Sequence, residues 1–309
     1  MDLTVPDVRI AVDSRIGHFR SAAAFADFLD HYRSCCAAMP PAAGIRDLPT
    51  AFGTVRCYRF AGGPGTPVLL LPGRNGPTPV YGTNVAALLP QRDVYCLDLL
   101  GEPGLSVQTA PITDSADQAR WLHQAITGLQ LPRLHLCGIS IGGWAAVNYA
   151  VRCRGPVATL TLLDPAMTFG RIPLPMLAAS IPMVIPGVPQ WIRRRLLSWI
   201  AGGSDVGAAA PVAELISAGT TDFVLRLPAP VRFTDAQLQG LQLPVLGLLG
   251  GRSVVVRADR AAQHARKLLP QAQIEVWPVA SHAINGEYPD EIAARAQRFW
   301  DTGGADHVA

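Results

Sequence analysis

At 309 residues, the chain is long enough for one large α/β domain or for a core domain with an inserted lid. Apolar residues make up 49% of the chain and charged residues only 16%, a balance typical of a globular protein with a large core. The net charge is only +3, and the single dense basic run is Arg193-Arg194-Arg195. A nucleic-acid surface needs a broader basic face with aromatic platforms, so we expect no nucleic-acid partner.

The N-terminal residues and the cysteines bear on the cellular compartment. Residues 1–7 carry no basic start followed by an apolar run, so we expect no secretory signal. Cys35 and Cys36 are adjacent, and Cys96 and Cys137 fall within expected buried strands, where a free thiol acts as a small apolar group. No cysteine pair has metal-ligand spacing with a matching histidine. These features predict a cytoplasmic protein without disulfide bonds, metal ion or organic cofactor.

Short apolar runs alternate with helical patterns along most of the chain. Apolar positions at helical spacing predict an N-terminal helix over about 14–39. Strands are expected at 55–60, 68–71, 94–97, 134–137, 159–163, 245–249 and 274–279. Helices are expected at 80–89, 115–129, 140–152, 258–269 and 287–300. Because most of the strands are continuous apolar runs, the alternation predicts an α/β protein with a doubly wound, mostly parallel sheet.

The alternation is interrupted between about residues 166 and 241, where prolines are frequent and no strand pattern is clear. Pro182 and Pro186 break the most apolar part, which argues against an integral membrane segment. We interpret 166–235 as an inserted helical cap that supplies apolar walls to a pocket, with 1–165 and 236–309 forming the core. The alternative is a surface excursion that covers an edge of the sheet.

The sequence Gly138-Ile139-Ser140-Ile141-Gly142 joins an apolar strand pattern to a helical one. A strand, a sharp turn and a helix are the setting in which G-x-S-x-G forms a nucleophile elbow. The glycines matter because the serine adopts a strained backbone conformation that a neighbouring Cβ would crowd. Ser140 is therefore the candidate nucleophile. A glycine-rich turn with an incidental serine is the alternative.

A nucleophilic serine needs a base, and His282 is the best-placed histidine. It follows the last expected strand and precedes the last expected helix, so it should lie on a loop above the sheet. From there it can take the proton from Ser140 and return it to the leaving group. The other histidines fall on helices, in a strand or in the tail, where structural or solvated roles are expected.

The oxyanion that forms during attack needs preorganised N–H donors. Ile141, directly after the nucleophile, offers one from its backbone. The loop Pro72-Gly73-Arg74-Asn75 follows an earlier strand, and the backbone N–H of Arg74 is the second predicted donor. Gly73 lets this loop approach the substrate closely, and Asn75 can add a side-chain donor. An unliganded glycine-rich turn is the alternative.

With these motifs the chain resembles an α/β-hydrolase of the lipase and carboxylesterase type, from about Tyr58 to Trp300 apart from the insertion. The stretch from Asp98 to Ser106 is similar to the family's D-x-x-G-x-G-x-S with one extra residue. The resemblance implies that Asp98 shapes this loop. Pro72 stands where the family usually has histidine, and Ser281 where it often has glycine.

The triad acid departs from the family pattern. The resemblance places an aspartate in the stretch after the insertion, but Ser253 occupies that position here. A serine lacks the full negative charge that stabilises an imidazolium. Some family members carry the acid one strand earlier, which corresponds to Asp164 in this chain. Asp164 is the predicted acid; its alternative role is a turn aspartate that ends the strand before Pro165.

The leading hypothesis is a serine hydrolase that cleaves an ester of an apolar small molecule through an acyl-enzyme. A lyase, cyclase or acyltransferase on the same scaffold is the second hypothesis, because the displaced acid weakens the argument for hydrolysis. A non-catalytic ligand-binding protein is the third, and it depends on Ser253 alone. The sequence leaves the substrate and the oligomeric state open.

Overall fold

The computed structural model describes residues 4–7, 10, 15–184, 188–200, 202–203 and 210–303. The strands are β1 His18–Phe19, β2 Gly44–Thr50, β3 Gly53–Leu71, β4 Arg92–Leu97, β5 Val107–Gln108, β6 Leu134–Ile139, β7 Val157–Leu163, β8 Phe223–Val224, β9 Val245–Gly250 and β10 Gln273–Trp277. The α-helices are α1 Ala22–Ala37, α2 Gly82–Leu88, α3 Ser115–Gly128, α4 Ile141–Arg152, α5 Leu174–Val184, α6 Gln190–Ile200, α7 Ala210–Asp222, α8 Asp235–Gln239, α9 Ala258–Leu268, α10 Ile284–Glu287 and α11 Pro289–Asp301, and a 3₁₀ turn, η1, covers Thr78–Tyr81.

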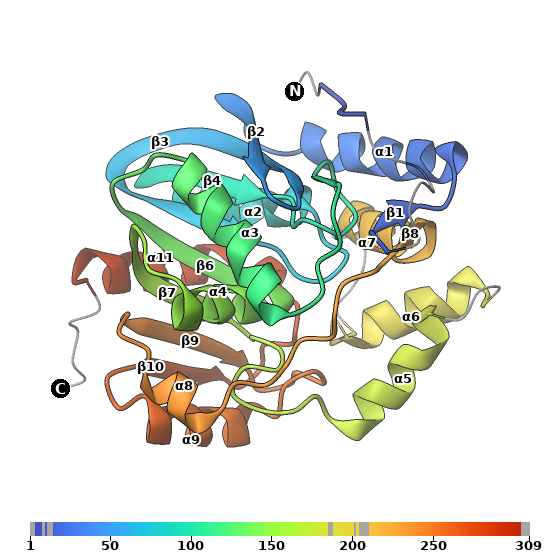
Figure 1. Cartoon of the computed structure of the whole chain (residues 1–309). Coiled ribbons are helices and arrows are strands. Elements are labelled where there is room, and N and C mark those ends of the chain that lie inside the picture. Colours follow the sequence, from blue (N-terminus) through green and yellow to red (C-terminus); the bar gives the residue numbers. More distant parts are fainter. Residues whose placement is uncertain are drawn as a thin grey trace.

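Within the described residues, the main sheet has the strand order β10-β9-β7-β6-β3-β2, and β4 and β5 also pair with β3 (Figure 1). β10, β9, β7, β6 and the second half of β3 are mutually parallel. β3 contains both of the strands expected at 55–60 and 68–71. Its first half runs antiparallel to β4, and after a break in register Val68–Leu70 lie opposite Val94–Cys96, so β3 bends back around β4. The predicted doubly wound, mostly parallel sheet is confirmed.

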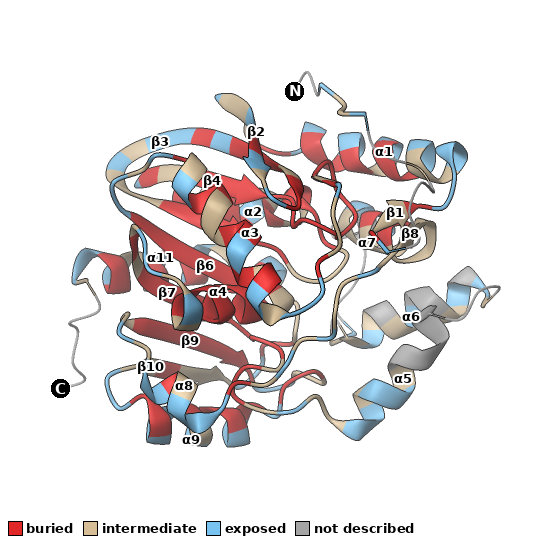
Figure 2. Ribbon diagram, in the orientation of Figure 1, coloured by how far each residue is buried: buried red, intermediate tan, exposed pale blue. Residues whose placement is uncertain are grey.

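Apolar side chains from alternate strand positions form one cluster on each face of the sheet. Leu69 and Leu71 of β3 pack with α3, α4, α8 and α9, whereas Val68 and Leu70 pack with α1, α2 and α11. Successive side chains of a strand point to opposite faces, so an uninterrupted apolar run serves both layers. Figure 2 shows β6 and β9 buried along their whole length, with exposed residues on the outer sides of the helices.

The N-terminal helix begins later than the periodicity predicts. Ser21 caps α1, with its side chain accepting from the Ala24 N–H, and the predicted start at residue 14 lies outside the described residues. His18 and Phe19 form β1 instead, which pairs with β8. β2 was also missed by the pattern, because it is an edge strand in which Pro49 and the charged pair Arg46-Asp47 are tolerated.

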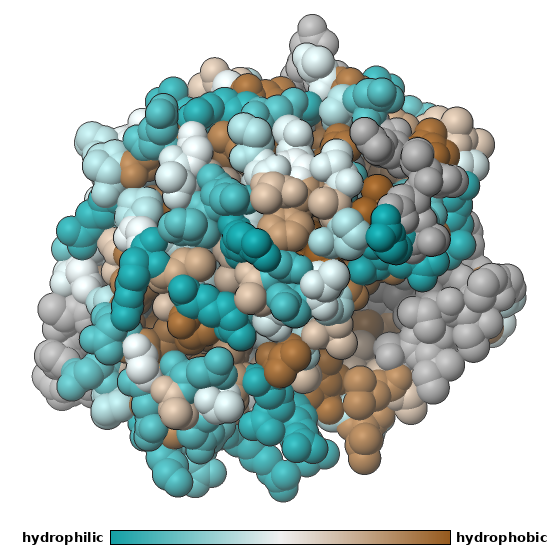
Figure 3. Space-filling model, viewed as in Figure 1, coloured by the Kyte–Doolittle hydropathy of each residue, from teal (hydrophilic) through white to brown (hydrophobic). Residues whose placement is uncertain are grey.

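The described part of the inserted segment 166–235 contains α5, α6, α7 and β8; Pro186 lies outside it. α7 packs against α1, and the Arg20 N–H donates to the Asp222 carbonyl at 2.9 Å. Leu174 and Trp191, on α5 and α6, are 78% and 66% exposed, and Figure 3 shows a brown, hydrophobic patch over α5 at the lower right. No described helix is long and apolar enough to cross a membrane. The division into core and cap stays a prediction.

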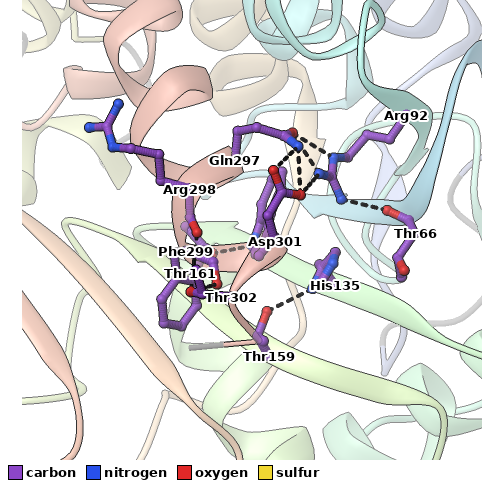
Figure 4. Close-up of polar contacts among 11 residues, drawn as sticks. Thr66, Arg92, His135, Thr159, Thr161, Gln297, Arg298, Phe299, Asp301 and Thr302 are labelled. Carbon is purple, nitrogen blue, oxygen red and sulfur yellow. Dashed lines mark hydrogen bonds and ion pairs between the residues drawn. The ribbon is translucent and has the colours of Figure 1, made fainter. Parts of the chain in front are cut away.

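A polar cluster joins α11 to the start of β4 and β6, at the opposite end of β6 from Ser140 (Figure 4). Arg92 at the start of β4 is 1% exposed, and its guanidinium donates to Thr66 O at 2.7 Å and to Gln297 Oε1 at 2.5 Å. The guanidinium also lies 4.6 Å from the centre of the Trp300 ring. His135 of β6 stacks on the same indole, with ring centroids 5.1 Å apart. These contacts join β4, β6 and α11.

Candidate active site

Ser140 lies in the sharp turn between β6 and α4. Its φ of 52° and ψ of −116° form a strained conformation for a residue with a Cβ. Gly138 and Gly142 make this turn sterically feasible. A Cβ on Gly138 would lie 2.3 Å from the Gly142 carbonyl oxygen, and a Cβ on Gly142 would lie 2.1 Å from the Leu71 carbonyl oxygen. The packing therefore gives both flanking glycines the role that the sequence pattern predicts.

His282 reaches Ser140 from the loop between β10 and α10. Its Nε2 lies 3.0 Å from Ser140 Oγ. The loop is held by Glu287, whose two carboxylate oxygens accept from Ser281 N at 2.8 Å and from Ser281 Oγ at 2.6 Å. Glu287 ends α10 and binds the residue before His282.

Asp164 follows β7 directly and is fully buried. Its Oδ2 lies 2.5 Å from His282 Nδ1, and its Oδ1 accepts from the Gly250 N–H at 3.0 Å. An ionised carboxylate can only accept, so Nδ1 carries the proton and Nε2 is free to accept from Ser140. Asp164 thus occupies the position of an acid that orients the histidine.

Ser253 lies beside Asp164. Its hydroxyl donates to Asp164 Oδ2 at 2.6 Å and accepts from the backbone N–H groups of Val255 at 3.2 Å and Val256 at 3.1 Å. The serine in the family's usual acid position thus contacts Asp164, which follows the neighbouring strand β7. Pairing of β7 with β9 places the ends of both strands side by side, and no one-dimensional pattern in the sequence reveals that contact.

The loop after β3 lies against the nucleophile. A Cβ built on Gly73 would be 3.5 Å from Ser140 Cβ, so this glycine allows a close approach of the two backbones. The Gly76 N–H donates to the Gly73 carbonyl at 3.1 Å, which closes a turn around Arg74 and Asn75. Ile141 is the first residue of α4, where an N–H has no helical partner. Ile141 therefore follows Ser140 in the chain, and Gly73, the residue before Arg74, lies against Ser140 in space.

The side chains of Arg74 and Asn75 turn to neighbouring segments. The Arg74 guanidinium pairs with the Glu102 carboxylate, with 3.1 Å between Nη1 and Oε1. The Asn75 side-chain amide donates one hydrogen to Thr220 Oγ1 of α7, with 2.9 Å between Nδ2 and Oγ1. Only the second amide hydrogen therefore remains for a ligand. The sequence does not indicate Glu102 or Thr220 as site residues, because each contacts the Arg74–Asn75 turn from a distant segment of the chain.

Asp98 directly follows β4 and begins a buried loop that runs to Ser106. Its carboxylate accepts from the N–H groups of Thr78 at 2.8 Å and Leu105 at 2.7 Å and from the Tyr32 hydroxyl at 3.0 Å. Burial raises the pKa of Asp98, and the N–H donors oppose that rise. These contacts suit the loop-shaping role that the resemblance implies. Among the described residues, no group of three or more His, Cys, Asp or Glu side chains is arranged to hold a metal ion.

Comparisons with known proteins cover most of the chain. A family model described as "Alpha/beta hydrolase family" matches residues 68–295, more than half of the sequence. Carboxylesterase YbfK of Bacillus subtilis (strain 168) is 26% identical over 261 residues, which cover 82% of this chain and 86% of the relative. The crystal structure of naproxen esterase (carboxylesterase NP) from Bacillus subtilis superposes with a TM-score of 0.82 at 22% identity. The superposition covers 91% of this chain and 99% of the esterase chain, which shows a shared fold.

Proposed function

The chain belongs to the α/β-hydrolase family, and from that premise we propose that it is a serine carboxylesterase, of the EC 3.1.1 type, acting on an apolar small-molecule ester. The observation that carries the proposal is the continuous series of contacts from Ser140 Oγ through His282 to Asp164, at 3.0 and 2.5 Å. The similar carboxylesterase from Bacillus subtilis, alike over most of both chains, supports ester cleavage.

In the acylation step, Ser140 Oγ attacks the ester carbonyl carbon while His282 Nε2 takes the hydroxyl proton. Asp164 stabilises the resulting imidazolium from the other side of the ring. The backbone N–H groups of Arg74 and Ile141 bind the negative oxygen of the tetrahedral intermediate. Collapse of that intermediate breaks the bond to the alcohol oxygen, which leaves with the proton from His282, and the acyl group stays on Ser140.

Deacylation repeats the sequence with water as the nucleophile. His282 takes one proton from the water as its oxygen attacks the acyl carbonyl. The tetrahedral intermediate then expels Ser140 Oγ, which recovers its proton from His282, and the carboxylic acid is released. All the groups needed are side chains and backbone N–H donors of this chain. The inserted segment 166–235 acts as a cap whose apolar side chains select the substrate.

The experiment is covalent labelling with a fluorophosphonate probe, which forms a phosphorus–oxygen bond to an activated serine with loss of fluoride. We expect labelling of the wild-type protein and turnover of short-chain nitrophenyl esters, both abolished by Ser140→Ala. Ser34→Ala, an exposed serine on α1, is the matched control and should change neither. A folded wild-type protein that is neither labelled nor active on the esters would refute the proposal.

Comparison of two variants separates hydrolysis from lyase, cyclase or acyltransferase chemistry on the same scaffold. An acyl-enzyme route needs Ser140 and His282 equally, so Ser140→Ala and His282→Ala should be similarly inactive. Activity that survives loss of Ser140 but not of His282 would favour a proton-transfer enzyme. The non-catalytic alternative depended on Ser253, and the contact of Asp164 with His282 argues against it.

A further inference from the structure

Glu102 is a buried carboxylate beside the loop that follows β3, and the reaction so far has no use for it. It is 4% exposed and lies in the stretch from Asp98 to Ser106 that carries one residue more than the family pattern. Burial raises the pKa of Glu102, and the Arg74 guanidinium and the Asn75 N–H oppose that rise. A carboxylate so far removed from water requires partners, because an unpaired buried charge is strongly destabilising.

Both partners of Glu102 belong to the turn that follows Gly73. Its Oε2 accepts from the Asn75 backbone N–H at 3.1 Å, and its Oε1 lies 3.1 Å from Arg74 Nη1. Asn75 has a φ of 57°, a left-handed conformation that few residues with a Cβ adopt. One carboxylate therefore contacts the backbone of one residue of the turn and the side chain of the other. This combination holds both residues of the turn against Glu102.

The opposite side of the turn rests on α7. Thr220 accepts from the Asn75 side-chain amide, and its own hydroxyl donates to the Ile216 carbonyl at 2.7 Å. A Cβ on Gly219 would lie 3.2 Å from the Asn75 carbonyl oxygen and 2.9 Å from Pro103, so α7 and the turn are in close contact. The turn is held between a buried charge and a helix of the inserted segment.

We propose that Glu102 is a positioning residue that holds the Arg74–Asn75 turn so that the Arg74 N–H points at the oxyanion, an inference that rests on the proposed function. Oxyanion stabilisation depends on donors that are aimed before the reaction begins. A neutral amide is a weaker acceptor than a carboxylate and cannot form an ion pair with the guanidinium. Loss of the charge should therefore impair the transition state more than substrate binding.

The test compares Glu102→Gln, Glu102→Leu and the wild-type protein on a nitrophenyl ester. Removal of a complete oxyanion donor lowers kcat by about 10²–10³-fold, so a displaced donor should lower it by about 10–100-fold. We expect that loss in Glu102→Gln with KM changed by less than about threefold, and a larger loss in Glu102→Leu. Affinity for a trifluoromethyl ketone, which mimics the tetrahedral intermediate, should fall in parallel. Glu291→Gln, an exposed glutamate of α11, is the matched control.

A second measurement reports on the turn without using activity. Hydrogen exchange of the backbone amides in residues 72–77 should be faster in Glu102→Leu than in the wild-type protein, because the Asn75 N–H loses its acceptor. Unchanged exchange in this segment would overturn the proposal even if the protein were no esterase. A labelled, active wild type together with a Glu102→Gln variant of undiminished kcat would overturn it while leaving the proposed function intact.

Discussion

His135 should make the protein less stable in acid, and the contribution of this one side chain can be separated from the rest. The imidazole is 2% exposed, its Nδ1 lies 2.9 Å from Thr159 Oγ1, and its ring stacks on Trp300. Burial, aided by the positive charges of Arg92 and Arg133, lowers the pKa of His135 from 6.5 to about 3. Figure 4 shows the imidazole beside Thr159 and close to the polar cluster of Arg92.

A histidine whose pKa is lower in the folded than in the unfolded chain takes up its proton on unfolding, so acid favours the unfolded state. The penalty begins as the pH falls below the unfolded value of 6.5 and stops growing below about 3. In that range each pH unit costs about 1.4 kcal/mol. Between pH 7 and pH 5, therefore, His135 alone should lower the free energy of unfolding by about 2 kcal/mol.

The assay is urea unfolding at 25 °C, followed by tryptophan fluorescence at pH 7, 6 and 5, for the wild-type protein and His135→Gln. The variant should be less stable at pH 7, because it loses the stacking on Trp300, but it should lose about 2 kcal/mol less between pH 7 and pH 5. His264→Gln, a half-buried histidine of α9, controls for removal of an imidazole elsewhere. Parallel pH dependences of His135→Gln and wild type would refute the reasoning.

Three further changes test the site and its support. Asp164→Asn should lower kcat by about 10⁴-fold with a folded protein, because the imidazolium loses its charge partner; a loss below tenfold in steady-state kinetics would remove Asp164 from the triad. Ser253→Ala should cost Asp164 one charge-assisted hydrogen bond and lower kcat by about 10–100-fold with KM preserved; an unchanged kcat would show that the Ser253 hydroxyl is dispensable. Gly142→Ala should lower the thermal midpoint by several degrees, because the added Cβ meets the Leu71 carbonyl oxygen; a midpoint equal to wild type in calorimetry would contradict the steric argument.

Local chemistry explains why the elbow and the central strands could be predicted from the sequence. The run from Leu134 to Ile139 is buried on both faces, and glycines flank Ser140 where a Cβ would clash with backbone atoms. The constraint at Gly138 involves Gly142, only four positions along the chain, so a short sequence pattern indicates it. Elements with weak local signals do not follow from the pattern: β2 is an edge strand with a proline, and the two-residue strands β1 and β8 pair with each other across distant segments.

The sequence by itself determined the fold class, the nucleophile candidate Ser140 and the histidine candidate His282, because periodicity, turn glycines and chain order encode them. Only the tertiary structure decided which groups meet. Parallel pairing of β7 with β9 brings Ser253 to Asp164 across 89 positions of sequence. The contact of Glu102 with the turn at Asn75 likewise joins separate loops. Hydrogen bonds of this kind depend on distances of about 3 Å in space, and no spacing along a chain specifies them.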